Sequence, residues 1–311
     1  MHQSLFFKAF PPPKYMSMRF AGLEISDDAI RCLQYSPSSR GQIISKYDQV
    51  LLPDDTILGG DIKNEVVFVD LLKKFDEKNN LNYVSVSIPE EKAYLFQTDV
   101  VGESEKDIAQ NIEFKLEENV PLLAKDAVFY FDLMPIEVTE GILRASVSVV
   151  PRTYVEKQIS LLQSAGVFPV AFEVAPKSIA RAALSCDPKK TSMVVHVMKS
   201  KIGIYIVSAG VVCFTSTVGH GDGNSLAQNI NHSLTYWSSR PGGHIDEILL
   251  AGSRAPEFED QIAASLNEKD KCPVSIANTW QNSLNLDSYT PNIPKVESLD
   301  YIVVAGLALD L

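Results

Sequence analysis

The chain has 311 residues, of which 45% are hydrophobic, and a formal net charge of −11. This length and composition fit a soluble globular protein with one large domain or two ordinary ones. The acidic balance argues against a nucleic-acid partner, because phosphate contacts require a basic surface. No apolar run reaches the length that a bilayer span needs, so we expect a cytoplasmic protein.

The first 17 residues are predicted to form an N-terminal tail. Its apolar side chains precede three consecutive prolines, and they are Leu5, Phe6, Phe7 and Phe10. The stretch is short and lacks a small-residue cleavage site, so it does not resemble a secretory signal. These side chains could contact a membrane surface or a partner, or they could pack on the protein's own domain.

The four cysteines are scattered along the chain at Cys32, Cys186, Cys213 and Cys272. They form no C-x-x-C pair and have no neighbouring histidine cluster, so the pattern suggests neither a metal site nor a disulfide framework. We expect buried thiols and no bound metal.

The first region is predicted to begin with a meander of three strands at 19–25, 29–35 and 42–52. A helix over 66–79 follows, because Val66, Val69, Leu72 and Phe75 recur at steps of three residues. A buried strand at 84–88 comes next. Strands joined by a crossover helix indicate the α/β class.

A compact strand, helix, strand, strand unit is predicted after this region. It comprises a strand at 94–101, a helix capped by Ser104, and a hairpin at 128–134 and 142–150. Another helix is predicted over 153–165, then a strand at 167–174 and a short helix at 177–184. The polar stretch 185–190 is the best domain boundary in the chain.

The opening pattern recurs beyond this boundary. Three strands are predicted at 193–197, 203–208 and 211–217, and a helix follows with Leu226, Ile230, Leu234 and Trp237 on one face. A strand at 245–251, a helix at 256–266, a strand near 273–276 and an apolar helix at 301–311 complete the region. Two regions that share this order predict one fold duplicated into two lobes.

Several stretches, in the same order along the chain, resemble the PilM family of type IV pilus assembly proteins. They are GLEISDDAIR (22–31), SIPEEKAYLFQTDV (87–100), IEFKLEENVPL (112–122), VVPRTYVEKQISLLQSAGVFPVAFEV (149–174), HSLTYW (232–237), IDEILLAGSRAPEFEDQI (245–262) and AGLALDL (305–311). Each stretch is weak by itself, but the ordered set spans nearly the whole chain.

The resemblance implies a two-lobed actin-like (ribonuclease H-like) α/β fold with an inserted strand-helix-strand-strand subdomain, of the kind that the PilM family shares with the division protein FtsA. The predicted boundaries are a tail at 1–17, a first lobe at 18–83 and 166–186, an insert at 84–165 and a second lobe at 190–311.

In this architecture, two turns from opposite lobes hold the phosphates of ATP, and a carboxylate at each turn organises Mg²⁺. The first turn matches Glu24, Ser26, Asp27 and Asp28, followed by the basic Arg31. Ser26 replaces a glycine that permits close backbone approach. The two aspartates add negative charge where a triphosphate would lie, so we expect repulsion.

The second turn departs further from the pattern. His196 occupies the acidic position, and a histidine is a poor substitute for an oxygen ligand of Mg²⁺. The adenosine turn is Gly252-Ser253 in place of two glycines. The loop that contains Gly219 and Gly221 could still bind an anion, or it could be only a tight connection. We therefore expect no cofactor, with weak binding of ATP and Mg²⁺ as the alternative, and no hydrolysis.

The resemblance implies a scaffold at the inner face of the cytoplasmic membrane, peripherally associated with it, that binds the N-terminal cytoplasmic peptide of a PilN-like single-pass membrane protein. Pilus motor ATPases and the platform protein are further candidate partners. The implied groove lies between the insert and the first lobe, with candidate lining residues Phe96, Ile112, Leu116, Val120 and Pro121. Each of these could instead fill the core of the insert.

Two other functions remain open at this point. One is an active nucleotide-dependent ATPase of the same machine, and the other is an FtsA-like division protein. The five histidines show no metalloprotease spacing and no serine lies in a G-x-S-x-G elbow, so the sequence predicts no other catalytic centre.

Overall fold

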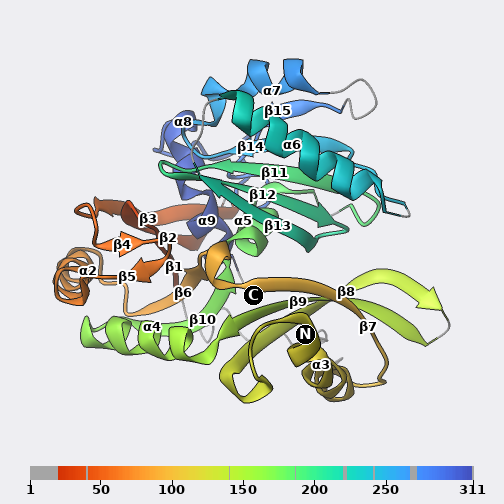
Figure 1. Cartoon of the computed structure of the whole chain (residues 1–311). Coiled ribbons are helices and arrows are strands. Elements are labelled where there is room, and N and C mark those ends of the chain that lie inside the picture. Colours follow the sequence, from red (N-terminus) through yellow and green to blue (C-terminus); the bar gives the residue numbers. More distant parts are fainter. Residues whose placement is uncertain are drawn as a thin grey trace.

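The computed structural model describes residues 20–39, 41–139, 141–185, 187–219, 223–240, 242–266 and 272–309. The predicted N-terminal tail and Cys186 lie outside these residues. Two five-stranded sheets and one three-stranded sheet form the framework (Figure 1). Among the described helices, none combines the length and apolarity that crossing a membrane requires.

The sheet of the first lobe has the strand order β10-β6-β1-β2-β3. Its strands are β1 (Ala21–Ile25), β2 (Ala29–Ser38), β3 (Gly41–Leu51), β6 (Tyr83–Ile88) and β10 (Phe168–Val174). The first three strands are antiparallel neighbours, whereas β6 runs parallel to both β1 and β10. The predicted meander and the crossover to a parallel strand are thus confirmed.

Helices cover both faces of this sheet, together with a small hairpin. The elements are β4 (Ile57–Leu58), β5 (Asp61–Ile62), α2 (Glu65–Asn79), α4 (Arg152–Ser164) and α5 (Ala175–Ala183). Because side chains alternate along a strand, Leu23 packs in the core beneath α2 and α4, whereas Gly22 faces the C-terminal helix on the other side. All of β1 is consequently buried.

The α2 helix lies where the sequence predicts it, but its buried stripe differs. Asn64 caps the helix by accepting a hydrogen bond from the amide of Val67. Phe68, Leu72 and Phe75 are buried, whereas Val66 is 81% exposed. The prediction that Val66 faces the sheet is wrong, because the period of an α-helix places Val66 on the face opposite the buried Phe68 and Phe75.

The second lobe repeats the first with the strand order β13-β12-β11-β14-β15. Its strands are β11 (Thr191–Val197), β12 (Lys201–Ser208), β13 (Val211–Gly219), β14 (Glu247–Ala251) and β15 (Val274–Ile276). Its helices are α6 (Gly223–Ser238), α7 (Glu259–Ser265), α8 (Lys295–Ser298) and α9 (Ile302–Leu307). The predicted duplication into two lobes is confirmed.

The insert is a three-stranded sheet in the order β7-β9-β8, with one helix on one face. Its elements are η2 (Glu90–Lys92), β7 (Tyr94–Val100), α3 (Glu105–Asn119), η3 (Ala124–Asp126), β8 (Ala127–Thr139) and β9 (Ile142–Pro151). The predicted strand-helix-strand-strand order is confirmed. Ser104 and Asp107 form a capping box that starts α3.

The boundaries of the insert are narrower than residues 84–165. The strand β6 is hydrogen-bonded within the sheet of the first lobe, and α4 contributes Leu161 and Leu162 to that lobe's core. Residues 84–165 therefore include β6 and α4, which pack with the first lobe. The chain forms β6 before it leaves this lobe and α4 after it returns to it.

The face of the insert sheet opposite α3 packs on the edge strand β13 of the second lobe. The Ser146 hydroxyl donates a hydrogen bond of 2.6 Å to the carbonyl of Val212, and the Gln97 amide donates one of 3.2 Å to the carbonyl of Cys213. Both faces of the insert sheet are therefore covered, one by α3 and the other by the second lobe.

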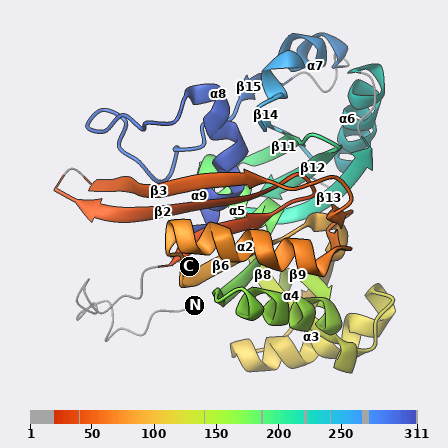
Figure 2. The ribbon, with the colours of Figure 1, turned by 90° about the vertical axis from the view of Figure 1, so that its left-hand side faces the viewer.

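The two lobes meet at α5 and α9, which both views place at the centre of the molecule (Figures 1 and 2). Residues of both helices form one hydrophobic cluster with Leu33 of the first lobe and Val194 of the second. The helices approach so closely that a Cβ atom on Gly306 would lie 1.8 Å from the carbonyl oxygen of Ser178. A Cβ atom on Gly22 would lie 2.3 Å from the carbonyl oxygen of Val304.

Replacing Gly306→Ala should therefore lower the free energy of unfolding by about 1 to 3 kcal/mol or more, because the obstructing atoms belong to the backbone and cannot rotate away. Gly219→Ala is the matched control, since nothing lies within 4 Å of its Cβ position, and it should change stability by less than about 0.5 kcal/mol. Urea unfolding measures both values. Equal effects of the two substitutions would contradict the close packing of α5 against α9.

Candidate functional site

Each of the two predicted phosphate turns follows the central strand of one lobe's sheet. The first turn, residues 26–28, joins β1 to β2, and the second, residues 198–200, joins β11 to β12. His196, near the end of β11, experiences the charges of Arg31 and Asp28 across the cleft. The two turns therefore lie close enough for charges beside one to act on a side chain beside the other.

Arg31 is buried at the centre of a cluster of polar and charged side chains around the first turn. Its guanidinium lies 3.1 Å from the Asp28 carboxylate and 3.6 Å from that of Glu24. The Ser26 hydroxyl donates a further hydrogen bond of 2.8 Å to Asp28. Although burial opposes ionisation, Arg31 and Ser26 outweigh it and lower the pKa of Asp28. The negative charge of Asp28 is therefore compensated inside the protein.

Glu24 is buried in the same cluster and behaves differently. Burial raises the pKa of Glu24 to about 7, and the nearby Arg31 only partly offsets this effect. One of its carboxylate oxygens, Oε2, has no hydrogen-bond partner among the described residues. At neutral pH this carboxyl group is partly protonated, which makes it a poor ligand for Mg²⁺.

Asp27 points away from the cluster. Its carboxylate accepts hydrogen bonds from the backbone amides of Gly59 and Gly60, at 3.1 and 2.9 Å, in the turn between β4 and β5. The Asp27 carboxylate therefore holds a neighbouring turn of the first lobe.

His196 is almost completely buried. Burial, together with the positive charges of Lys201 and Arg31, lowers the pKa of His196 to about 3, so the imidazole is neutral at physiological pH. Its Nδ1 atom has no hydrogen-bond partner among the described residues. The histidine supplies neither the negative charge nor the oxygen donor that a metal-bound triphosphate requires.

The adenosine turn, Gly252-Ser253, packs against other parts of the protein and is hydrogen-bonded to them. Gly252 has a φ of +91°, and a Cβ atom there would lie 2.1 Å from the carbonyl oxygen of Val197. The next amide, that of Ser253, donates a hydrogen bond of 3.0 Å to Asp300. Gly219 ends β13, and Gly221 lies outside the described residues.

The described residues at this site do not fit Mg²⁺ and ATP. Within the part of the chain that the structure describes, no group of three or more histidine, cysteine or acidic side chains is arranged to hold a metal ion. The carboxylates are paired with Arg31 or with backbone amides, and the Ser253 amide is already bonded. Among the described residues, the side chains of Asp27, Asp28 and Arg31 and the Ser253 amide therefore have partners within the protein.

One set of contacts, between the second lobe and the start of the insert, was not predicted from the sequence. Lys201 forms an ion pair with Glu91, and the Thr217 hydroxyl donates to Glu90 at 3.3 Å. The two glutamates stand in the quoted stretch SIPEEK, but nothing in the sequence links them to a lysine 110 residues further on.

The predicted groove residues do not line a groove together. Ile112, Leu116 and Val120 are buried in the core between α3 and the insert sheet, and Phe96 packs on the same core. Pro121 is exposed just beyond the end of α3. The groove assignment is wrong for the three buried residues, because the face of α3 that carries them is the face that holds the insert together.

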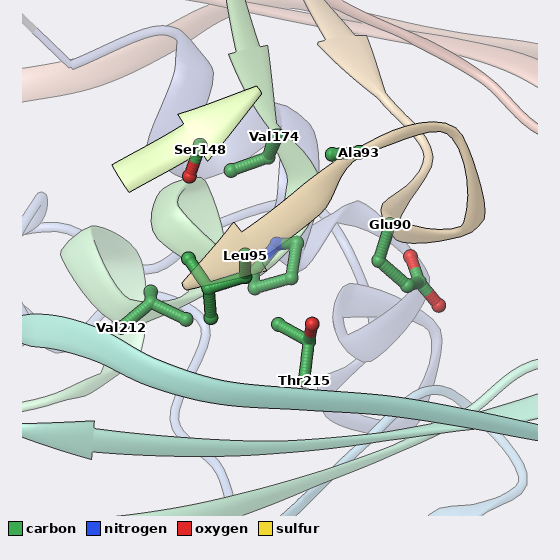
Figure 3. A pocket seen from close by; sticks show the side chains of 8 residues that line it. Glu90, Ala93, Leu95, Ser148, Val174, Val212 and Thr215 are labelled. Atoms are coloured by element: carbon green, nitrogen blue, oxygen red, sulfur yellow. The ribbon is translucent and has the colours of Figure 1, made fainter. Parts of the chain in front are cut away.

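A small cavity of about 10 Å³ lies on the other side of the insert sheet, where three units meet (Figure 3). Leu95 and Ser148 come from the insert, Val174 from the first lobe and Val212 from the second (Figure 3). The complete lining is Glu90, Ala93, Leu95, Ser148, Val174, Pro176, Val212 and Thr215. Aliphatic side chains dominate it, and its volume is about that of a single water molecule, which is too small for a ligand.

The strand β8 forms the outer edge of the insert sheet. It carries exposed apolar side chains, Val128, Tyr130 and Leu133. Lys177, on α5 of the first lobe, lies 3.6 Å from the centre of the Tyr130 ring and 2.9 Å from the Asp132 carboxylate. The edge of β8 therefore lies beside the first lobe, where the resemblance places a groove.

The protein thus has the two-lobed actin-like α/β fold that the sequence predicts. No family model matches the chain, and no curated protein matches it. Among solved structures, it is similar to a chain of the PilM–PilN type IV pilus biogenesis complex, with a TM-score of 0.76, 15% identity, and 94% of this chain and 98% of that chain covered.

Two further solved structures share the fold. One is the cytoplasmic domain of EpsL, an inner-membrane component of the type II secretion system of Vibrio cholerae, with a TM-score of 0.51, 12% identity, and 91% of this chain and 93% of that chain covered. The other is the ethanolamine utilization protein EutJ from Carboxydothermus hydrogenoformans, with a TM-score of 0.50, 10% identity, and coverage of 96% and 90%. At these identities the similarities establish the fold.

The carboxyl group of Glu24 should make stability depend on pH. Its pKa is about 7 in the folded protein against 4.5 ordinarily, so the folded state binds the extra proton and loses stability as pH rises from 4.5 through 7. Glu24→Gln should therefore gain stability relative to the parent protein between pH 5 and pH 8, by on the order of 2 to 3 kcal/mol.

His196→Gln provides the opposite comparison in the same urea-unfolding series. Because the pKa of His196 falls from 6.5 to about 3 on folding, this histidine costs stability as pH falls below 6.5, and its replacement should help most at low pH. A Glu24→Gln effect of the same size at pH 5 and pH 8 would contradict the burial of an ionisable Glu24.

Proposed function

We propose that this protein is a PilM-like scaffold of a type IV pilus assembly machine, which binds a short cytoplasmic peptide of a PilN-like membrane protein and does not hydrolyse ATP. The observation that carries the proposal is the similarity in fold, over nearly the full length of both chains, to a chain of the PilM–PilN complex. The ordered set of sequence stretches that resemble the PilM family supports it independently. The scaffold would be cytoplasmic and would reach the membrane through its partner.

The peptide is proposed to add as a strand along the edge of β8. An edge strand presents unpaired amide and carbonyl groups, which bind an extended peptide irrespective of its side chains. Val128, Tyr130 and Leu133 would supply apolar contacts that select particular side chains. Because Lys177 connects this edge to α5, a peptide bound here would contact the first lobe as well as the insert.

The absence of hydrolysis is proposed from the chemistry of the cleft. Phosphoryl transfer depends on a metal ion and on amides that neutralise the charge of the phosphates. Here a neutral histidine occupies one acidic position, and Arg31 pairs with the carboxylates at the other turn. The competing proposal, an actin-like ATPase of the same machine, would require these internal pairs to separate.

A labelled peptide that corresponds to the N-terminal cytoplasmic segment of a PilN-like protein should bind with micromolar affinity in a fluorescence-anisotropy titration. Tyr130→Ala should weaken binding about tenfold, equivalent to about 1.4 kcal/mol, because it removes an exposed ring beside the edge. Phe114→Ala is the control, since this ring is 86% exposed on the outer face of α3. Failure to bind at millimolar peptide, or equal losses in both variants, would count against the proposal.

A fluorescent ATP analogue with Mg²⁺ should show no micromolar binding, and Glu24→Ala should leave its weak signal unchanged. The reason is that the groups around the cleft are bonded to each other. Micromolar binding that Glu24→Ala abolishes, or measurable turnover of ATP, would favour the ATPase.

A further inference from the structure

A partly buried ion pair joins the end of the second phosphate turn to the start of the insert. Lys201 is the first residue of β12 in the second lobe, and Glu91 lies in η2, directly after β6 of the first lobe. Their side chains form an ion pair and are only 13% and 20% exposed. An ion pair shielded in this way is screened by salt much less than one on the surface.

A second contact lies beside the first. The Thr217 hydroxyl on β13 donates a hydrogen bond of 3.3 Å to Glu90, the neighbour of Glu91. Burial opposes the charge on Lys201, but Glu90 and Glu91 together outweigh it and raise the pKa of the lysine. Lys201 is therefore a stable cation that is paired with Glu91 and lies close enough to Glu90 to be affected by its charge.

The C-terminal segment adds a third contact at the adenosine turn. Asp300, in the turn η6 (Leu299–Tyr301) that precedes α9, accepts the hydrogen bond from the Ser253 amide. The carboxylate of Asp300 also lies close enough to Arg31 and Glu24 to influence the pKa of each. The cationic Arg31 of the first lobe thus faces a carboxylate that is anchored on the second.

We propose that the contacts of Lys201 with Glu91 and of Thr217 with Glu90 form a latch that holds the two lobes closed without a nucleotide. In the actin-like architecture, phosphates lie between turns of opposite lobes, so a nucleotide supplies the charge that joins them. Here the chain supplies both charges itself. The cation is Lys201 on the second lobe, and the anions are Glu90 and Glu91, directly after β6 of the first lobe. The latch goes beyond the proposed scaffold function, because it does not depend on which partner is bound.

The position of the shared core around α5 and α9 explains what such a latch would do. That core joins the lobes at the centre of the molecule, whereas the cleft is bridged by the polar contacts just described. A central core of this kind permits rotation of the lobes about it unless contacts away from the core resist. The latch would fix the angle between the lobes and hence the position of the insert, which packs on β13.

The test measures the distance between lobes in the full chain with a pair of spin labels. Glu77→Cys on α2 and Gln261→Cys on α7 are exposed attachment positions, in a background with Cys186 and Cys272 replaced by serine. The parent protein should give one narrow distance distribution, unchanged by millimolar ATP with Mg²⁺. Lys201→Glu should add a population at longer distance, and the charge swap Lys201→Glu with Glu91→Lys should remove it.

The matched control is the exposed ion pair of Lys74 with Asp70, 2.8 Å apart on one helix, whose charge reversal should leave the distribution unchanged. If Lys201→Glu fails to fold, Glu91→Gln serves as the milder variant and should show the longer distance at a smaller population. A distribution insensitive to Lys201→Glu or to Glu91→Gln, a charge swap that does not restore it, or a narrowing caused by ATP would overturn the latch. None of these outcomes depends on peptide binding, so the scaffold proposal is tested separately.

Discussion

The packing of α9 against α5 is the constraint on which the rest of the structure depends. A carbonyl oxygen of one helix lies where a side chain of the other would be, so only glycine fits at position 306. The same helix lies over Gly22 at the centre of the first sheet. These close approaches join the two sheets at the centre of the molecule, and the two predicted phosphate turns follow the central strands β1 and β11.

The cleft illustrates how a binding site can be filled by the chain that forms it. Arg31 pairs with carboxylates of its own lobe, Asp300 takes the amide of the adenosine turn, and Lys201 pairs with Glu91. Buried charges are tolerated only when they are paired, and here each charge finds its counterion within the protein.

Much of the fold was predictable because strands and amphipathic helices leave periodic patterns in the sequence. The meander of each lobe and the stripe of α6 followed from such patterns, whereas the two-residue strands β4 and β5 are too short to produce one. The site was less predictable, because the partners of Asp27 and Lys201 are distant in the sequence. The groove assignment failed for Ile112 because an apolar stripe does not reveal whether it faces a core or a ligand.

The insert has a further consequence for the dynamics of the molecule. It is one uninterrupted segment with a hydrophobic core separate from those of the lobes, and its entry and exit are paired, since Tyr94 lies opposite Val149. A segment with these properties can open and reclose as a cooperative unit while the surrounding sheets stay intact. Amide hydrogens of β7 to β9 would then exchange with solvent at a lower free energy than those of β1 and β11, and the part of the molecule proposed to bind the partner would be the first to respond to it.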